Sequence, residues 1–284
     1  MIIVNLKGGV FMKKHSLGLL AAVFLLAGAL AACGNKEAKS DSNTIVVGAS
    51  AIPHAAILKH VQQELKKEGI NLKVKVFSDY VLPNKALASG ELDANYYQHK
   101  PFLKKANKDN GYDLVSVGSI HLEPLGLYSK QVKKLSDVKS GAKVLVSSSQ
   151  PDWGRVLTIL KDGGLITLKS GVNAENATFK DIASNPKHLK FEYTFEPKLM
   201  PELLKNDEGT LVAINSNYAV QAGLNPEKDA VALEKQSSPF ANIVVTNKKD
   251  RNNPAIKKLV KALKSKSTQE WIKNKWHGAV LPVE

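Results

Sequence analysis

The residues best suited to chemistry in this chain of 284 residues are one cysteine, Cys33, and two arginines, Arg155 and Arg251. All other basic residues are lysines, although Lys and Arg together number 40. Arginine can bind a carboxylate through two parallel N–H groups, whereas lysine is a solvated point charge. Either arginine is therefore conspicuous if it falls inside a motif. A single cysteine excludes a disulfide framework and a cysteine-rich zinc site.

No signature of a common catalytic site is present in the sequence. The P-loop, the dinucleotide-binding glycine motif, the nucleophile elbow and the H-E-x-x-H zinc motif are all absent. His54 and His60 lie on different faces of a predicted helix and make a poor metal pair, and the seven histidines are dispersed. We therefore expect a binding protein with no catalytic residue, no metal and no cofactor. A hydrolase that uses scattered Asp and Glu stays open, although no spacing favours it.

The N-terminal segment has the pattern of a secretory signal. Met12-Lys13-Lys14-His15 precedes an uncharged run rich in Leu and Ala, at 16–32. Leu30-Ala31-Ala32-Cys33 resembles a bacterial lipobox, which implies cleavage before Cys33 and acylation of that residue. We predict a signal peptide at 1–32, with Met12 as the natural start, and a flexible lipid-anchored tether at 33–43. The protein is then expected on the extracytoplasmic face of the cell membrane.

The net charge of +14 comes almost entirely from lysine. Such a surface indicates solubility and attraction to an anionic envelope rather than specific reading of nucleic acid, which relies on arginine. We expect no nucleic-acid partner. A lysine-rich surface adhesion protein is the alternative from a different functional class.

The rest of the chain alternates predicted strands and helices. Apolar residues spaced like Ile57, Val61 and Leu65 give one face of a helix, and alternation over 70–76 gives a strand. The predicted strands are 44–48, 70–76, 90–97, 142–146 and 210–214, and the predicted helices are 53–69, 83–88, 154–161, 216–223 and 254–266. This order predicts an α/β fold with mostly parallel sheets covered by helices.

Several stretches of the chain share residues with one known family. They include Ser78-Asp79-Tyr80-Val81-Leu82-Pro83-Asn84, Asp93-Ala94-Asn95-Tyr96-Tyr97-Gln98-His99-Lys100-Pro101, Ala213-Ile214-Asn215-Ser216-Asn217-Tyr218-Ala219 and Ser238-Pro239-Phe240-Ala241-Asn242. In these segments the chain resembles the NlpA family, the methionine-binding lipoproteins of ABC importers. The resemblance implies a type II periplasmic-binding-protein-like fold, in which two lobes enclose a ligand cleft. Lobe 1 would be 44–122 plus 241–284, and lobe 2 would be 123–240.

The same resemblance implies a pocket for a zwitterionic amino acid. Arg155 falls at the family arginine that binds the ligand carboxylate, and we place it at the start of the helix after strand 142–146, where the helix dipole favours an anion. Asn215 and Asn242 match asparagines that bind the ligand's charged ends, whereas helix capping explains Asn217 better. The aromatic side of the pocket, suited to a thioether, would be formed by Tyr80, Tyr97 and His99.

Two departures from the family pattern bear on the ligand. Asp152 stands where the family commonly has asparagine, so its carboxylate could neutralise Arg155 or bind the ligand ammonium. Trp153, beside it, could line the pocket or pack outside. We expect a monomer that binds L-methionine or a close relative and delivers it to an ABC permease and its ATPase. The open alternatives are D-methionine, a methionine-containing dipeptide or another amino acid.

Overall fold

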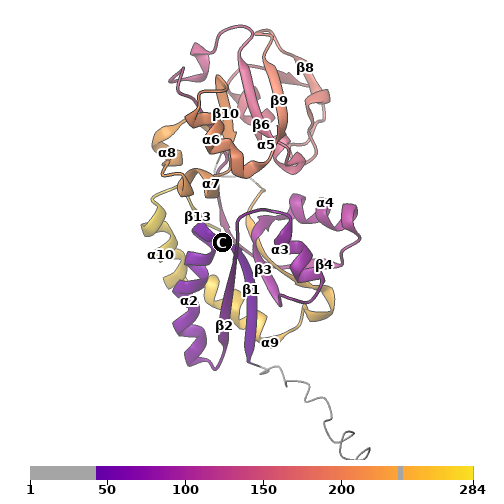
Figure 1. Ribbon diagram of the computed structural model, residues 1–284, viewed down its shortest axis with the longest axis vertical. Coiled ribbons are helices and arrows are strands. Elements are labelled where there is room, and N and C mark those ends of the chain that lie inside the picture. Colours follow the sequence, from indigo (N-terminus) through magenta and orange to yellow (C-terminus); the bar gives the residue numbers. More distant parts are fainter. Residues whose placement is uncertain (1–42, 236–238, 284) are drawn as a thin grey trace, which may run out of the picture. The chain divides into compact units, whose positions relative to one another are not determined.

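The computed structural model describes residues 43–235 and 239–283 (Figure 1). The predicted signal peptide, Cys33 and almost all of the predicted tether lie outside the described residues. Within the described part, no helix combines the length and the apolar composition needed to cross a membrane. The strands form one sheet of six, one sheet of five and a separate pair.

The six-stranded sheet has the order β13-β4-β12-β3-β1-β2. Its strands are β1 (Thr44–Ser50), β2 (Asn71–Phe77), β3 (Ala94–His99), β4 (Leu114–Leu122), β12 (Asn242–Asn247) and β13 (Leu281–Pro282). The first four strands along the chain run in the same direction, whereas β12 runs antiparallel to both β3 and β4.

The five-stranded sheet has the order β11-β5-β10-β6-β9. Its strands are β5 (Gly126–Tyr128), β6 (Lys143–Ser147), β9 (Lys190–Phe195), β10 (Leu211–Ile214) and β11 (Ala230–Leu233). The separate pair is β7 (Thr167–Leu168) and β8 (Ile182–Ser184). The chain passes between the two main sheets twice, through 123–125 and through 234–241.

The helices lie between these strands in the sequence. The α-helices are α2 (Ala56–Lys67), α3 (Leu82–Ala88), α4 (Lys100–Asn110), α5 (Gln150–Asp162), α6 (Met200–Lys205), α7 (Ser216–Gln221), α8 (Pro226–Asp229), α9 (Pro254–Leu263) and α10 (Lys266–Trp276). The shorter turns are η1 (Ala51–Ala55), η2 (Leu135–Asp137), η3 (Phe179–Asp181), η4 (Pro197–Leu199) and η5 (Lys248–Asp250). The α/β class is confirmed, and so are most of the predicted helices, apart from their ends.

Most strands of each main sheet run in one direction, and each sheet also contains antiparallel pairings. The antiparallel pairings in the main sheets all involve β5, β11, β12 or β13. Three of these strands lie next to a passage between the sheets: β5 follows the first passage, and β11 and β12 stand on either side of the second. The βαβ units elsewhere keep the parallel direction that their connecting helices impose.

Two apolar layers cover the six-stranded sheet. On one face, Val244 of β12 packs in a cluster with α2, α9 and α10, and on the other face Ile243 and Val245 pack with α3 and α4. Strand β12 is therefore apolar without alternation, as expected for a strand buried on both faces. Asn253 caps helix α9, because its Oδ1 accepts a hydrogen bond from the Ala255 N–H at 2.9 Å.

The five-stranded sheet is covered in the same way. Helix α5 packs on the face that carries Val144 and Val146, and helices α6 and α7 pack on the face that carries Leu145 and Val212. Alternate residues of a strand point to opposite faces, which assigns each apolar side chain to one layer. Each main sheet thus has its own apolar core on both faces.

We predict that Gly154→Ala destabilises the protein, although alanine normally stabilises a helix relative to glycine by up to about 1 kcal/mol. A Cβ atom at Gly154 in α5 would lie only 1.7 Å from the carbonyl oxygen of Ala174. The required shift should lower the free energy of unfolding by about 1–3 kcal/mol in urea denaturation. Lys161→Ala, at an exposed position of α5, is the control and should change it by less than about 0.5 kcal/mol. A stabilised Gly154→Ala variant would contradict the close contact.

Candidate ligand-binding site

A pocket lies at the carboxyl-terminal ends of the parallel strands of both sheets. In open α/β sheets, this is the edge at which ligands bind. The lining residues lie at the end of β3, follow β1, β2, β3, β4 and β10, or lie in α5 and at the start of β12. They are His54, Tyr80, Tyr97, Gln98, His99, Phe102, Glu123, Asp152, Arg155, Asn215, Ser216, Asn217 and Asn242.

All seven residues predicted to bind the ligand line this one pocket. They are Tyr80, Tyr97, His99, Asp152, Arg155, Asn215 and Asn242. Their contacts with a ligand stay predictions, but the fold brings them together from positions spread over more than half of the chain. Six further lining residues were not predicted, and all of them except Phe102 are buried polar residues: His54, Gln98, Glu123, Ser216 and Asn217.

Arg155 is the most heavily bonded side chain of the site, and it is only 4% exposed. Its Nε and one terminal nitrogen donate to the Glu234 carboxylate, the latter at 2.5 Å. That terminal nitrogen also donates to the Glu123 carbonyl oxygen at 2.8 Å, and the other donates to Asp152 at 3.0 Å. Of the five N–H groups of a guanidinium, one on the second nitrogen is left. A bidentate bond to a ligand carboxylate would therefore require an exchange of partners.

The predicted position of Arg155 at a helix start is wrong. Helix α5 begins at Gln150, so Arg155 lies in its second turn and Asp152 lies in the first. The early start has an ordinary cause: Pro151 occupies one of the first helical positions, where the ring fixes a helical φ and the missing N–H is not needed. The favourable dipole position thus belongs to the carboxylate of Asp152 rather than to a ligand anion held by Arg155.

The Asp152 carboxylate accepts hydrogen bonds at both oxygens. Oδ1 accepts from His99 at 3.2 Å and from Arg155 at 3.0 Å, and Oδ2 accepts from Ser149 at 2.8 Å and from Asn215 at 3.2 Å. Burial alone would raise the pKa of Asp152, but the bond to His99 and the charge of Arg155 hold the pKa well below its ordinary value. Asp152 therefore neutralises Arg155, as one of the two predicted alternatives states.

The ring of His99 is held from both sides. Its Nδ1 accepts a hydrogen bond from the Phe102 N–H at 3.2 Å, so His99 caps helix α4. This bond places the proton of the neutral ring on Nε2, which faces Asp152. The ring also meets Phe240 edge-on, with centroids 5.1 Å apart. His99 thus positions Asp152 instead of presenting a free edge to the pocket.

Tyr80, Tyr97 and Phe102 form an aromatic wall. The ring centroid of Tyr80 lies 6.1 Å from that of Tyr97 and 5.9 Å from that of Phe102. The Tyr97 hydroxyl donates to the Tyr80 carbonyl oxygen at 3.0 Å, which gives this buried group the polar partner it requires. Burial raises the pKa of both tyrosines well above the ordinary value, so their hydroxyls stay protonated.

Asn217 does not cap a helix, so the capping interpretation is wrong. It lies inside α7, is 4% exposed, and its Oδ1 accepts from the Tyr80 hydroxyl at 2.6 Å. Its side-chain nitrogen is buried and has no hydrogen-bond partner among the described residues. An unpaired buried donor is costly. Asn217 therefore offers a ligand a donor that the protein leaves unused.

Glu123 and two buried histidines form a second polar group of the site. The same oxygen of Glu123 lies 2.8 Å from His121 Nε2 and 3.1 Å from His54 Nε2. Burial raises the pKa of the Glu123 carboxyl. Burial also lowers the pKa of His54 to about 4 and that of His121 to about 3, so both rings are neutral at pH 7.

The tryptophans of the chain lie outside the pocket lining. Trp153 donates to the Ser147 carbonyl oxygen at 2.9 Å and packs against Phe179, with centroids 5.1 Å apart. Trp276 belongs to the core beside α2, and Trp271 stacks on His60 with centroids 4.1 Å apart. These contacts agree with packing roles, and Trp153 neither lines nor blocks the pocket.

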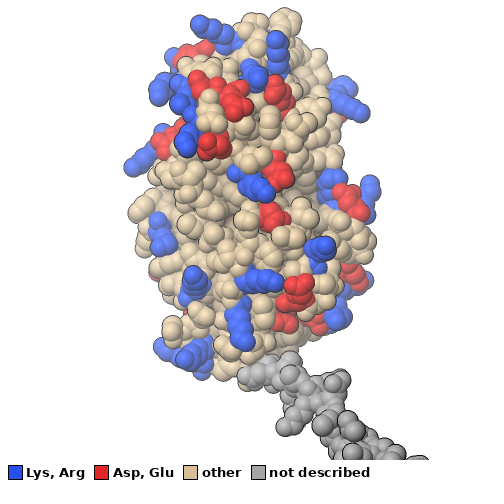
Figure 2. Space-filling view, viewed as in Figure 1, with Lys and Arg blue, Asp and Glu red and all other residues tan. Residues whose placement is uncertain are grey.

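Glu234 is the partner of Arg155 that the sequence did not reveal. It follows β11, and besides Arg155 it binds the Leu125 N–H at 3.2 Å. No motif marks it, because its importance comes only from the fold that brings it to Arg155. The remaining charge is spread out: on the visible face, acidic side chains lie among the lysines rather than apart from them (Figure 2). That face carries no continuous basic patch.

We predict that Asp152→Asn lowers the free energy of unfolding by about 3 kcal/mol at pH 7, because it breaks a buried ion pair. The pKa of Asp152 is depressed in the folded state. Its stabilising contribution is therefore present above the unfolded pKa of about 3.8 and is lost as the pH falls below it. Urea denaturation should show that the difference in free energy of unfolding between wild type and variant is smaller at pH 3.5 than at pH 7.

The control for this measurement is Asp109→Asn, which removes an exposed ion pair with Lys105. Exposed pairs contribute little, so the control should cost less than about 1 kcal/mol at either pH. An Asp152→Asn gap of the same size at both pH values would contradict a depressed pKa.

Comparison with known proteins gives consistent matches. The family model described as NlpA lipoprotein matches residues 45–284. "Methionine-binding lipoprotein MetQ" of Bacillus subtilis (strain 168) is 47% identical over 275 residues, which are 96% of this chain and 99% of that protein.

Solved structures give similar matches. A structure described as a pheromone cOB1 precursor/lipoprotein of the YaeC family, from Enterococcus faecalis V583, is 57% identical with a TM-score of 0.83, over 84% of this chain and 100% of that one. A nutrient binding protein from Burkholderia cenocepacia bound to methionine is 42% identical with a TM-score of 0.78, over 84% and 100%.

Proposed function

The chain belongs to the NlpA lipoprotein family, and from this premise we propose that it binds L-methionine, or a close relative, and delivers it to an ABC importer. The observation that carries the proposal is a buried pocket that joins unused donors, acceptors and an aromatic wall. The family consists of binding proteins, and a role without catalysis accords with a site whose charged groups are already paired to one another.

The polar groups of the pocket suit both ends of an amino-acid zwitterion. The spare N–H of Arg155 and the unpaired nitrogen of Asn217 can donate to a carboxylate. The carboxylate of Glu123 and the side-chain oxygen of Asn215 can accept from an ammonium group, since Asn215 uses its nitrogen for Asp152. A zwitterion that leaves water needs such partners at both ends, because unpaired buried charge is costly.

The aromatic wall suits the methionine side chain. Tyr80, Tyr97 and Phe102 present ring faces and edges, and thioether sulfur gains about 0.3–1.5 kcal/mol from such contacts. The hydroxyls of Tyr80 and Tyr97 are occupied by Asn217 and by the Tyr80 carbonyl oxygen. The wall is therefore apolar toward the ligand. An amino acid with a charged side chain would lose its hydration there without a partner.

We predict that Arg155→Ala weakens methionine binding roughly 30-fold or more, since it removes a buried charged partner. Isothermal titration calorimetry on the full chain in detergent, after an unfolding and refolding wash to remove bound ligand, measures this. Arg251→Ala, at the other arginine of the chain and exposed, is the matched control and should bind like wild type. Because Arg155→Ala removes the cation that pairs with Asp152 and Glu234, Asn217→Ala serves as a milder variant, with about fivefold weaker binding expected.

A second experiment on the washed protein separates the alternative ligands. Native mass spectrometry of the washed chain with L-methionine, D-methionine, a methionine-containing dipeptide and other amino acids should give the strongest complex with L-methionine. If the protein prefers the dipeptide or D-methionine, the proposed ligand is wrong but the proposed importer role stands. Binding only to heparin-like polyanions, fading steeply with salt, would replace the proposal with the surface adhesion protein.

We further propose that Cys33 carries the lipid that holds the protein on the extracytoplasmic face of the membrane, near its permease and ATPase. Two acyl chains give stable anchoring where one gives marginal binding. Cys33→Ser should therefore move most of the protein from the membrane fraction to the soluble fraction in a cell that acylates lipoproteins. Ser50→Ala, in β1, should leave the distribution unchanged. A Cys33→Ser protein that stays in the membrane fraction would contradict lipid attachment at this residue.

A further inference from the structure

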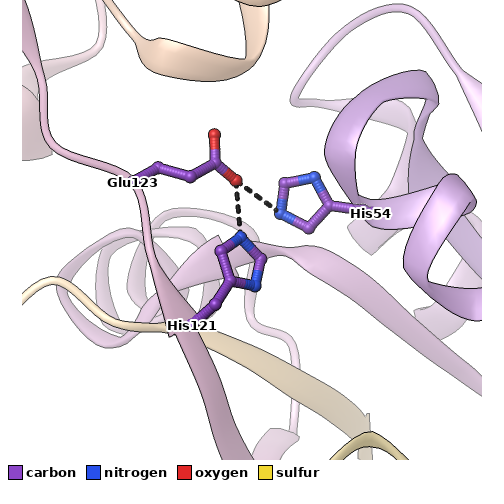
Figure 3. A group of neighbouring side chains, drawn as sticks. All are labelled: His54, His121 and Glu123. Carbon is purple, nitrogen blue, oxygen red and sulfur yellow. Dashed lines mark hydrogen bonds and ion pairs between the residues drawn. The ribbon is translucent and has the colours of Figure 1, made fainter. Parts of the chain in front are cut away.

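His54 and His121 each direct Nε2 toward the same carboxylate oxygen of Glu123 (Figure 3). The three atoms lie within 4.8 Å of one another, and all three residues are buried. His54 comes from the turn after β1, His121 from β4, and Glu123 from the passage between the sheets. We propose that these three side chains form a binding site for a divalent transition-metal ion, with Zn²⁺ as the probe.

The donor set matches the chemistry of zinc. Two imidazoles and one carboxylate, with a further position left open, are a recurrent zinc arrangement. Imidazole nitrogens disfavour Mg²⁺ and Ca²⁺, which take oxygen ligands. No thiolate is needed in such a set, so the prediction that a single cysteine excludes a cysteine-rich site still holds. No local motif marks the pair, because His54 and His121 are far apart along the chain.

The distances need only a small adjustment to accept an ion. Glu123 Oε1 lies 2.8 Å from His121 Nε2 and 3.1 Å from His54 Nε2. Ligand atoms about 2.0–2.2 Å from a tetrahedral zinc ion are about 3.3 Å apart. These two distances would lengthen by a few tenths of an ångström, and the separation of the two histidine nitrogens, which lies within 4.8 Å, would adjust by rotation of the rings.

The neighbouring groups are those that metal-binding histidines commonly have. His121 Nδ1 is hydrogen-bonded to the Tyr96 hydroxyl, which lies behind the ring and away from Glu123. Such a bond from the second ring nitrogen orients a metal-binding imidazole. On the other side, Asn242 Oδ1 lies 3.0 Å from His54 Nε2. A single N–H of His54 thus faces two oxygens, of Asn242 and Glu123, whereas a cation could contact both oxygens and the ring.

The charge of the site also favours a cation. Among the described pocket residues, the carboxylates of Glu123 and Asp152 face one guanidinium, Arg155, which is already paired with Glu234. An amino-acid zwitterion adds no net charge to this set. A divalent cation would balance the excess of buried carboxylates, whose desolvation is otherwise costly. His54, Glu123 and Asn242 line the ligand pocket, so the open coordination position faces that pocket.

The test is equilibrium dialysis of the full chain against buffered Zn²⁺, after treatment with a chelator and without any amino acid. A Cys33→Ser background removes the only thiol. We expect one zinc ion per chain, measured by plasma emission spectrometry. Because no methionine is used, the result does not depend on the proposed ligand, and either proposal can fail alone.

The variants separate this site from adventitious surface binding. His121→Ala and the isosteric Glu123→Gln should each weaken zinc binding at least about tenfold. His60→Ala removes an exposed histidine on helix α2 and should bind zinc like wild type. Circular dichroism checks that each variant is folded.

X-ray absorption of the zinc-loaded protein, in the same Cys33→Ser background, gives a readout that needs no substitution at the site. Two imidazole nitrogens and one or two further light ligands are expected in the first shell. The proposal is overturned by the absence of stoichiometric zinc, by a shell without imidazole, or by variants of His121 and Glu123 that both bind zinc as tightly as wild type.

Discussion

The pocket depends on one constraint, which is that the buried positive charge of Arg155 must be balanced by carboxylates. Its partners come from three separate parts of the chain: the first turn of α5, the passage after β4 and the segment after β11. A buried charge that loses a partner costs several kcal/mol. The two passages between the sheets are therefore fixed to the same side chain, and the walls of the pocket are set by the bonds that this side chain makes.

The pocket side chains are held before any ligand arrives. Tyr97 is bonded to the Tyr80 backbone, Tyr80 to Asn217, and His99 and Asn215 both to Asp152. Binding then orders few rotamers, which reduces the entropic cost of association. One N–H of Arg155 and the Asn217 nitrogen are donors that this bonded frame leaves without a partner among the described residues.

The sequence predicted the elements that have a strong local pattern. Helix α2 has apolar residues at regular spacing, and strand β2 alternates, so both could be located without tertiary information. Strand β12 escaped prediction because a strand buried on both faces has no alternation. Helix α4 escaped because only Leu103 of its residues is fully buried, which leaves no apolar stripe to detect.

The site shows the same division between local and long-range information. The predicted pocket residues were found through family motifs, whereas their partners were not. Glu234 and His121 have no local signature, and their contacts with Arg155 and Glu123 exist only because of strand order. The start of α5 could have been read from Pro151, and doing so would have placed Asp152 rather than Arg155 at the helix N-terminus. Asn217 resembled a cap because polar residues near helix starts usually are caps.

The place of β12 inside the first sheet has a consequence for the order of folding during synthesis. The five-stranded sheet is built from one continuous stretch and is complete once residue 233 has emerged. The six-stranded sheet, in contrast, has β12 between β3 and β4. Strands β3 and β4 therefore have unpaired edges until residue 247 has been made, because each of them pairs with β12. Unpaired edges invite association with other chains, so the edges of β3 and β4 are open to aggregation while residues 123–247, a little under half of the chain, are being made.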